Sequence, residues 1–230
     1  MHSLCLVALL LALPAAIDSA RVQAFEKHYQ HTRTLKASFF QRYSDGKVAG
    51  TAESGTVYFS RPGRMRWDYE SPEQKVFLVD GKNVWFYVPA DRTASRTKLN
   101  ESSDWRTPLA LLTGKADLSH LCRVIEITNA EAGSESGSGE HPRRPSGTIF
   151  HCKPRSNSTG PDSALSEVVL ESDAANRLIR VVIREAGNVE TEFRFGNWEE
   201  NLTIPEATFH FEPPPGVTIV DEATLAGVIH

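Results

Sequence analysis

The sequence lacks the short motifs that mark common catalytic and nucleotide-binding sites. Gly114 and Lys115 have no partner glycine upstream at the spacing that a phosphate-binding loop requires. No G-x-S-x-G nucleophile elbow is present, and the carboxylates are scattered rather than set in an acid/base pair. We therefore expect a protein that is not an enzyme and that needs no cofactor.

Metal-ligating side chains are also too sparse to predict a site. His28 and His31 could share one face of a helix, but without a third ligand a solvated helix face is the simpler interpretation. Cys122 and Cys152 have no histidine cluster around them. His151 directly precedes Cys152, yet neighbours on a strand point to opposite faces, so the two should not form a nucleophile pair. We expect no metal site.

The sequence has no excess of positive charge and only one long apolar run. Its formal net charge is -4, which argues against nucleic acid or an anionic membrane as the main partner. The run "LCLVALLLALPAA" is too short to span a membrane and is followed by small residues up to Ala20. These features predict a secretory signal peptide over residues 1–20 and a single exported domain over residues 21–230. A buried N-terminal helix is the alternative.

Cysteine is scarce, with only three in the chain. Cys5 lies inside the predicted signal peptide, too early and in the wrong context for lipid attachment, so we expect a protein without a lipid anchor. Cys122 and Cys152 then remain as an even pair. In an exported protein such a pair favours a disulfide, with two buried thiols on neighbouring strands as the alternative.

Strand-like alternation is abundant. Met65, Trp67 and Tyr69 share one parity, with charged residues between them, so one face of this segment is strongly apolar. Asp80-Gly81 supplies the residues of a tight turn between two further apolar runs, which predicts a hairpin over residues 74–92. Other strand candidates are residues 35–43, 56–62, 122–128, 148–154, 166–172, 177–185, 188–200, 207–213 and the end of 212–220.

Two segments have helical signals instead. Residues 22–34 place Val22, Phe25 and Tyr29 on one helical face. Residues 107–114 begin with a Thr-Pro pair and end at a glycine, which are typical start and stop signals of a helix. The residues between these signals are almost all apolar, so this short helix must be covered on several sides or contact a ligand.

The elements together predict a mainly β fold of about ten or eleven antiparallel strands. A sheet of that size normally curls into a barrel or half-barrel, and the helices could cover its open side. Residues 129–147 are rich in Gly, Ser, Glu and Pro, and we expect an exposed flexible loop there. With no catalytic constellation, this architecture favours a lipid carrier, and an exported domain with a filled core is the alternative.

Residues 61–92, "RPGRMRWDYESPEQKVFLVDGKNVWFYVPADR", resemble the LolA family of outer-membrane lipoprotein carriers of Gram-negative bacteria. That family has an Arg-Pro pair before an aromatic-rich strand, then a strand ending in Asp-Gly-Lys, then Trp-x-Tyr and a proline. The stretches "LKASFFQ" and "TPLALL" and residues 195–222 also resemble family segments, in the family's order. The resemblance is weakest over residues 129–164.

The resemblance implies an incomplete antiparallel β-barrel, closed by a helical lid, that performs no covalent chemistry. Such a carrier would take acylated lipoproteins from an inner-membrane ABC-type release complex and cross the periplasm, where we expect a monomer. It would then deliver them to an outer-membrane lipoprotein receptor. A periplasmic lipid-sensing regulatory module and a carrier of another amphiphilic lipid are the alternatives.

The resemblance also assigns a role to Arg61, which aligns with the family arginine that bonds to the lid helix and holds the empty cavity shut. A guanidinium suits this role because it offers five donors in a rigid fork, and the last carbonyls of a helix lack partners. The predicted lipid-binding residues on the concave face are Phe39, Phe59, Met65, Trp67, Tyr69, Leu78, Leu109, Leu111, Leu112, Phe193 and Phe195.

Two of these predictions have direct competitors at the neighbouring position. Phe40 competes with Phe39 for the concave face, because both positions are aromatic. In the second strand of the hairpin, Trp85 and Tyr87 compete with Phe86 and Val88 in the same way. Alternation alone does not choose between them.

Overall fold

The fold is a single open sheet with α-helices on its concave side. The computed structural model describes residues 13–46, 50–99, 111–114, 117–129, 147–155 and 165–221. Its helices are α1 (Leu13–His31), α3 (Leu118–Leu121) and the 3-10 helix η3 (Glu206–Phe209). Its strands are β1 (Thr34–Ser44), β2 (Ala52–Ser60), β3 (Arg64–Ser71), β4 (Lys75–Val79), β5 (Asn83–Val88), β6 (Thr93–Lys98), β7 (Cys122–Asn129), β8 (Thr148–Pro154), β9 (Leu165–Ser172), β10 (Leu178–Glu185), β11 (Val189–Glu200) and β12 (Thr218–Asp221).

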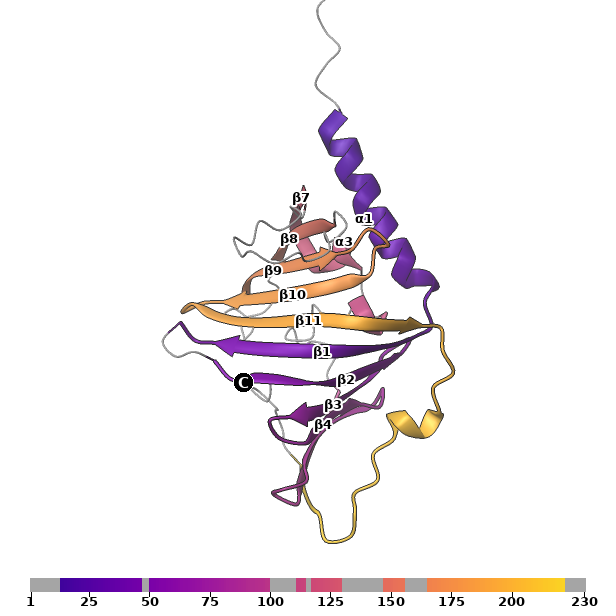
Figure 1. Cartoon of the computed structure of the whole chain (residues 1–230), viewed down its shortest axis with the longest axis vertical. Coiled ribbons are helices and arrows are strands. Elements are labelled where there is room, and N and C mark those ends of the chain that lie inside the picture. The colour runs from indigo at the N-terminus through magenta and orange to yellow at the C-terminus, as the bar shows by residue number, and fades with distance from the viewer. Residues whose placement is uncertain are drawn as a thin grey trace, which may run out of the picture.

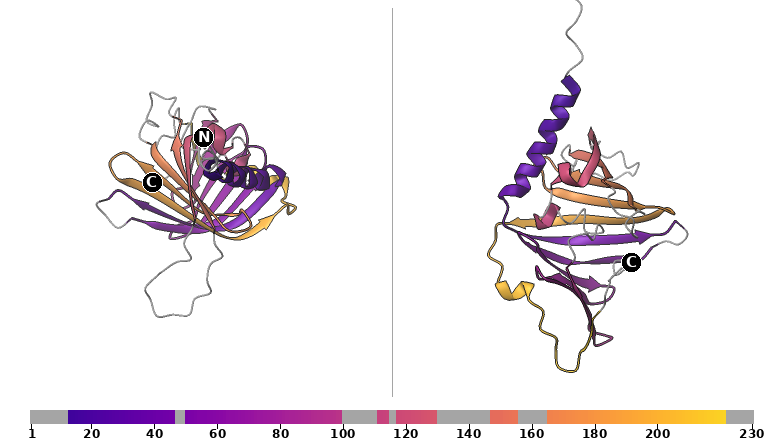
Figure 2. Two further views of the ribbon diagram at one scale, coloured as in Figure 1. Left: turned by 90° about the horizontal axis from the view of Figure 1, so that it is seen from above. Right: turned by 180° about the vertical axis from the view of Figure 1, so that it is seen from behind.

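The sheet is an incomplete barrel, as predicted. Its strand order is β12-β6-β5-β4-β3-β2-β1-β11-β10-β9-β8-β7 (Figure 1). Neighbouring strands pair antiparallel except for β12, which runs parallel to β6. Among the described residues, β12 and β7 are the two ends of this order, so the sheet does not close on itself. Figure 2 shows the strands fanning out into a curved sheet beside α1.

Helix α1 is fixed to the concave side by aromatic side chains. Phe25 and Tyr29 are completely buried, and the Phe25 ring lies 4.9 Å from the ring of Phe150 on β8. The Tyr29 hydroxyl accepts a hydrogen bond from the backbone N–H of Leu178 at 2.7 Å. The predicted helical face therefore does pack on the sheet. Residues 1–12 of the predicted signal peptide lie outside the described residues, and residues 13–20 form the first turns of α1.

Two segments differ from the sequence-based prediction. Residues 93–98 form strand β6, which carries few apolar residues and gave no strand signal. Residues 207–213 are not a strand, because the chain forms η3 there and continues irregularly into the proline-rich stretch. This segment lies against the outer face of the sheet, where Arg66 Nη1 donates to the Thr208 carbonyl at 3.2 Å. The predicted loop over 129–147 falls mostly on residues 130–146, which lie outside the described residues.

A buried carboxylate joins three strands on the outer face. The Glu192 side chain of β11 is only 1% exposed. It accepts hydrogen bonds from Arg180 Nε at 2.5 Å, Arg194 Nε at 3.0 Å and Arg42 Nη2 at 2.9 Å. Burial alone would raise the pKa of Glu192, but the bonds from Arg180 and Arg194 outweigh it and hold the pKa below its ordinary value.

We expect Glu192→Gln to lower the free energy of unfolding by about 2 kcal/mol at pH 7, because charge-assisted bonds to a buried carboxylate are lost. The lowered pKa means that this stabilisation is present above the pKa of the unfolded chain and is lost as the pH falls. The free energies of unfolding of variant and wild type, measured in urea, should therefore become equal below about pH 4. Glu199→Gln is the control, since Glu199 is 54% exposed and forms a surface ion pair with Lys36. A loss as large as that of Glu192→Gln would contradict the prediction.

Candidate functional site

The concave face of the sheet is a continuous aromatic surface. Side chains alternate along each strand, so every second residue of β1, β2, β3 and β11 points to this side. Trp67 lies at its centre and is 2% exposed. The ring centroids around it are those of Phe39 at 4.7 Å, Phe193 at 5.4 Å, Phe195 at 6.0 Å, Phe59 at 6.3 Å and Tyr69 at 6.5 Å.

Most of the predicted lining residues gather in this one cluster. Phe39 is 3% exposed whereas Phe40 is 41% exposed, so the concave face takes Phe39. Leu109 lies outside the described residues. The predicted residues in the buried cluster are Phe39, Phe59, Met65, Trp67, Tyr69, Leu111, Leu112, Phe193 and Phe195.

Leu78 lies on the opposite face from the predicted one. Strand β4 pairs with β3 so that Phe77 lies opposite Trp67, which places Phe77 on the concave side and Leu78 on the outer side. Leu78 is fully buried there, paired with Trp85. Both parities of β4 are apolar because both of its faces are covered, so alternation carries no signal.

The same register settles the choice in β5. Phe86 lies opposite Phe77 and packs against the concave cluster. Trp85 and Tyr87 point outward, where their rings lie 5.1 and 5.4 Å from the ring of Phe211 in the C-terminal segment. The sequence-based prediction missed the contributions of Phe77, Val79 and Val84 to the concave cluster.

The concave face becomes polar at the end away from α1. The Tyr69 hydroxyl donates to Gln41 Oε1 at 2.9 Å, and both residues are buried. Lys75 lies opposite Tyr69 in the register, forms an ion pair with Glu53 and places its Nζ 5.0 Å from the centre of the Tyr69 ring. Burial, reinforced by the charge of Glu53, raises the pKa of Tyr69 above its ordinary value, so this hydroxyl stays protonated.

Arg61 bridges the two helical segments that cover the concave face. Its Nη1 donates to the carbonyl of Thr32, just after α1, at 3.1 Å. Its Nη2 donates to the carbonyl of Leu111 at 3.4 Å, in the helical residues 111–113. Burial disfavours the charge and lowers the pKa of Arg61 from its ordinary value. Arg61 thus contacts residues 111–113, part of the segment that the resemblance assigns to the lid, and its action as a latch stays a prediction.

Backbone contacts complete this junction. The Gly63 N–H donates to the carbonyl of Thr113 at 2.8 Å. Gly114 has a φ of +72°, and a Cβ atom there would lie 2.5 Å from Arg61 Nε. Glycine at this position therefore serves both the helix end and the close approach of the guanidinium.

Cys122 and Cys152 form a disulfide between β7 and β8, with their Cα atoms 5.3 Å apart. Both are 2% exposed and belong to the concave cluster. The bond therefore ties the end strand of the sheet to its neighbour from the buried side.

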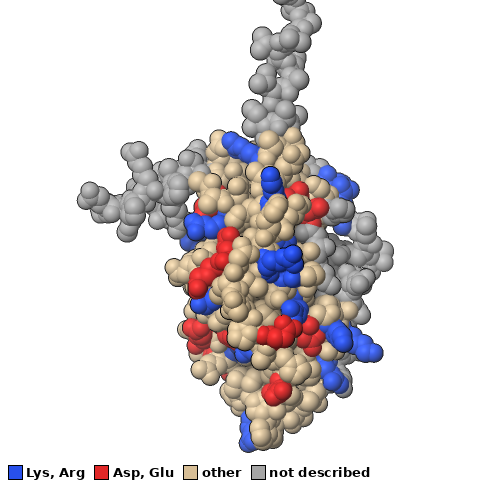
Figure 3. Space-filling model, turned by 90° about the vertical axis from the view of Figure 1, so that its right-hand side faces the viewer, with Lys and Arg blue, Asp and Glu red and all other residues tan. Residues whose placement is uncertain are grey.

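A hollow of about 440 Å³ lies on the outer face, between the sheet and residues 202–208. Its walls carry Lys36, Tyr58, Arg66 and Asp68, so its chemistry does not suit an acyl chain. Charged side chains of both signs are also interspersed over the molecular face that includes the C-terminal segment (Figure 3).

No group of His, Cys, Asp and Glu side chains among the described residues could hold a metal ion. No helix in the same residues has the length and apolar character needed to cross a membrane.

Comparison with known proteins agrees with this geometry. The family described as "Outer membrane lipoprotein carrier protein LolA" matches residues 30–136. The outer-membrane lipoprotein carrier protein of Dechloromonas aromatica is 28% identical over 211 residues, covering 91% of this chain and 92% of the relative. That of Nitrosospira multiformis is 26% identical over 221 residues, covering 95% and 97%.

A solved structure supports the fold. An uncharacterized conserved protein from Thermus thermophilus superposes with a TM-score of 0.53 at 12% identity, covering 89% of this chain and 99% of the other. Similarity at that identity concerns the fold alone. The family match over residues 30–136, together with curated relatives that extend over nearly the whole chain, shows that the chain is similar to the LolA family.

Proposed function

We propose that the protein is a periplasmic carrier that binds the acyl chains of lipoproteins against its concave aromatic face. The observation that carries this proposal is the combination of that face with a cover formed by the end of α1 and residues 111–113. Nine predicted lining residues lie in one buried cluster. Arg61 holds the two parts of the cover together by donating to the carbonyls of Thr32 and Leu111. The names of the curated relatives support the same role.

The cover accounts for how a carrier can release its cargo. Burial of acyl chain stabilises a complex by ~0.8 kcal/mol per methylene, so full enclosure of several long chains would hold them almost irreversibly. An empty apolar cavity is itself unfavourable. A cover that closes over the face when cargo is absent lowers the net affinity, because loading must first break the Arg61 bonds.

The surrounding pathway follows from the proposed role. The signal peptide over residues 1–20 would direct the protein to the periplasm, where residues 21–230 act as a single monomeric domain. Lipoproteins would come from the inner-membrane ABC-type release complex and pass to an outer-membrane lipoprotein receptor. The transfer moves cargo without covalent chemistry, so it requires no catalytic residue and no cofactor.

A release assay tests the proposal. The protein is purified from the periplasm and incubated with spheroplasts that carry labelled lipoproteins. We expect label in the soluble fraction, bound to the protein, and none with an equal amount of serum albumin. Absence of label with folded protein would contradict the proposal. Recovery of other lipids in place of lipoproteins would point to a carrier or sensor of a different amphiphile.

A further inference from the structure

The concave face contains a buried polar atom without a partner. Trp67 is 2% exposed, and among the described residues its indole Nε1 makes no hydrogen bond. Four of the five aromatic side chains around it are phenylalanines, and the fifth, Tyr69, directs its hydroxyl to Gln41 and does not accept from the indole. A buried donor without a partner is unfavourable, and native proteins contain few of them. This atom therefore suggests that something else supplies an acceptor.

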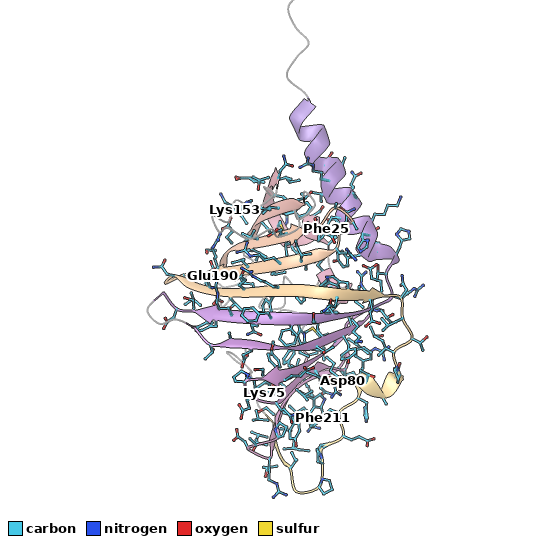
Figure 4. All side chains as sticks on the ribbon, in the orientation of Figure 1. Phe25, Lys75, Asp80, Lys153, Glu190 and Phe211 are labelled. Atoms are coloured by element: carbon cyan, nitrogen blue, oxygen red, sulfur yellow. A yellow bond between two sulfur atoms is a disulfide. The ribbon has the colours of Figure 1, made fainter. Side chains whose placement is uncertain are left out.

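The position of Trp67 along the face indicates what the acceptor is. On the α1 side the face is apolar, with Met65 and Phe59 paired across β3 and β2. On the other side come the Tyr69–Gln41 hydrogen bond and the Lys75–Glu53 ion pair. Figure 4 labels Phe25, a residue of α1, and shows Lys75 far from this helix. Trp67 thus lies where the apolar surface gives way to the polar one.

An acyl cargo has the same division. Its chains are apolar, its linker is polar, and its only acceptors next to the chains are the carbonyl oxygens of the ester and amide links. An indole N–H can only donate, so it suits a carbonyl and offers nothing to a methylene. Resting on the proposed function, we propose that Trp67 Nε1 donates a hydrogen bond to an acyl carbonyl of the cargo. The chains then extend toward α1 and the polar linker toward Tyr69 and Gln41.

Paired probes test this inference. One is a synthetic diacyl lipopeptide whose two chains are ester-linked, and the other is its ether-linked analogue, in which each acyl carbonyl is replaced by a methylene and the charge is unchanged. We expect the wild type to bind the carbonyl probe about fivefold more tightly, the effect of one neutral hydrogen bond. Trp67→Phe should reduce that preference to about one, and this ratio is the readout because the smaller ring lowers the affinity for both probes alike. Competition against a fluorescent fatty acid measures both constants.

Trp198→Phe is the matched control, because the Trp198 indole N–H already donates to the Leu178 carbonyl at 2.7 Å. This variant should keep the fivefold preference. A spectrum of ¹⁵N-indole-labelled wild type needs no variant: the Trp67 N–H resonance should move downfield with the carbonyl probe only. Equal affinity of the wild type for both probes would overturn the inference and leave the carrier function intact. Failure to bind either probe would overturn the carrier function itself.

Discussion

Replacing Arg61 with leucine is expected to make the protein retain its cargo, slowing transfer to the outer-membrane receptor at least about tenfold. The empty, closed protein would lose the bonds from the guanidinium to the Thr32 and Leu111 carbonyls. A hydrogen bond from a charged donor contributes about 1.5–3 kcal/mol, and ~1.4 kcal/mol changes an equilibrium tenfold. In the proposed mechanism these bonds break when cargo is loaded, so their loss should favour the loaded state.

The measurement is the rate at which labelled lipoprotein leaves the loaded carrier for membranes that contain the receptor. Gly114→Ala is the matched variant, since its Cβ would displace the Arg61 guanidinium without removing the charge. It should slow release in the same direction. Unchanged release by both folded variants would show that Arg61 has an ordinary structural role and does not act as a latch.

Removing the Cys122–Cys152 disulfide should lower the free energy of unfolding by about 3.5 kcal/mol. The bond joins residues that are 30 positions apart, and a loop of that length has about this closure entropy in the unfolded chain. The destabilisation should be largest at the end of the sheet, because β7 pairs only with β8 among the described strands. For a domain of this size the melting temperature should fall by roughly 10 °C.

Thermal unfolding of the wild type with and without dithiothreitol measures the effect without changing any side chain. The double variant Cys122→Ala/Cys152→Ala then provides a sample that reductant cannot alter further, and its melting temperature should be near that of the reduced wild type. If dithiothreitol reduces the bond completely and leaves the melting temperature unchanged, the predicted contribution of the disulfide is wrong.

Much of the fold is predictable from local pattern. Met65, Trp67 and Tyr69 alternate with charged residues, so the alternation alone assigns their shared face to the interior. Asp80-Gly81 marks the β4–β5 hairpin, where Gly81 has a φ of +97° and Asp80 Oδ1 accepts the N–H groups of residues 82 and 83. Patterns of this kind need only neighbouring residues, which a sequence displays directly.

The long-range features cannot be predicted in the same way. Leu78 and Phe77 are both apolar, and only the register with Trp67 decides which of them faces the concave side. The charged cluster at Glu192 cannot be predicted from the sequence either, because its arginines come from three different strands. Residues 207–213 resemble a strand in sequence, and nothing in their composition reveals that they cover the outer face.

The sequence by itself therefore determined the fold class, the apolar parity of β3 and, through its resemblance to the LolA family, the arginine at the cover. The tertiary structure decided which side of β4 and β5 faces inward, how Arg61 reaches two segments at once, and that Trp67 Nε1 is buried with no partner among the described residues. The physical reason is that alternation sorts residues between two faces. Only the pairing of strands and the elements packed on each face decide which face encloses the site and which atoms remain unpaired.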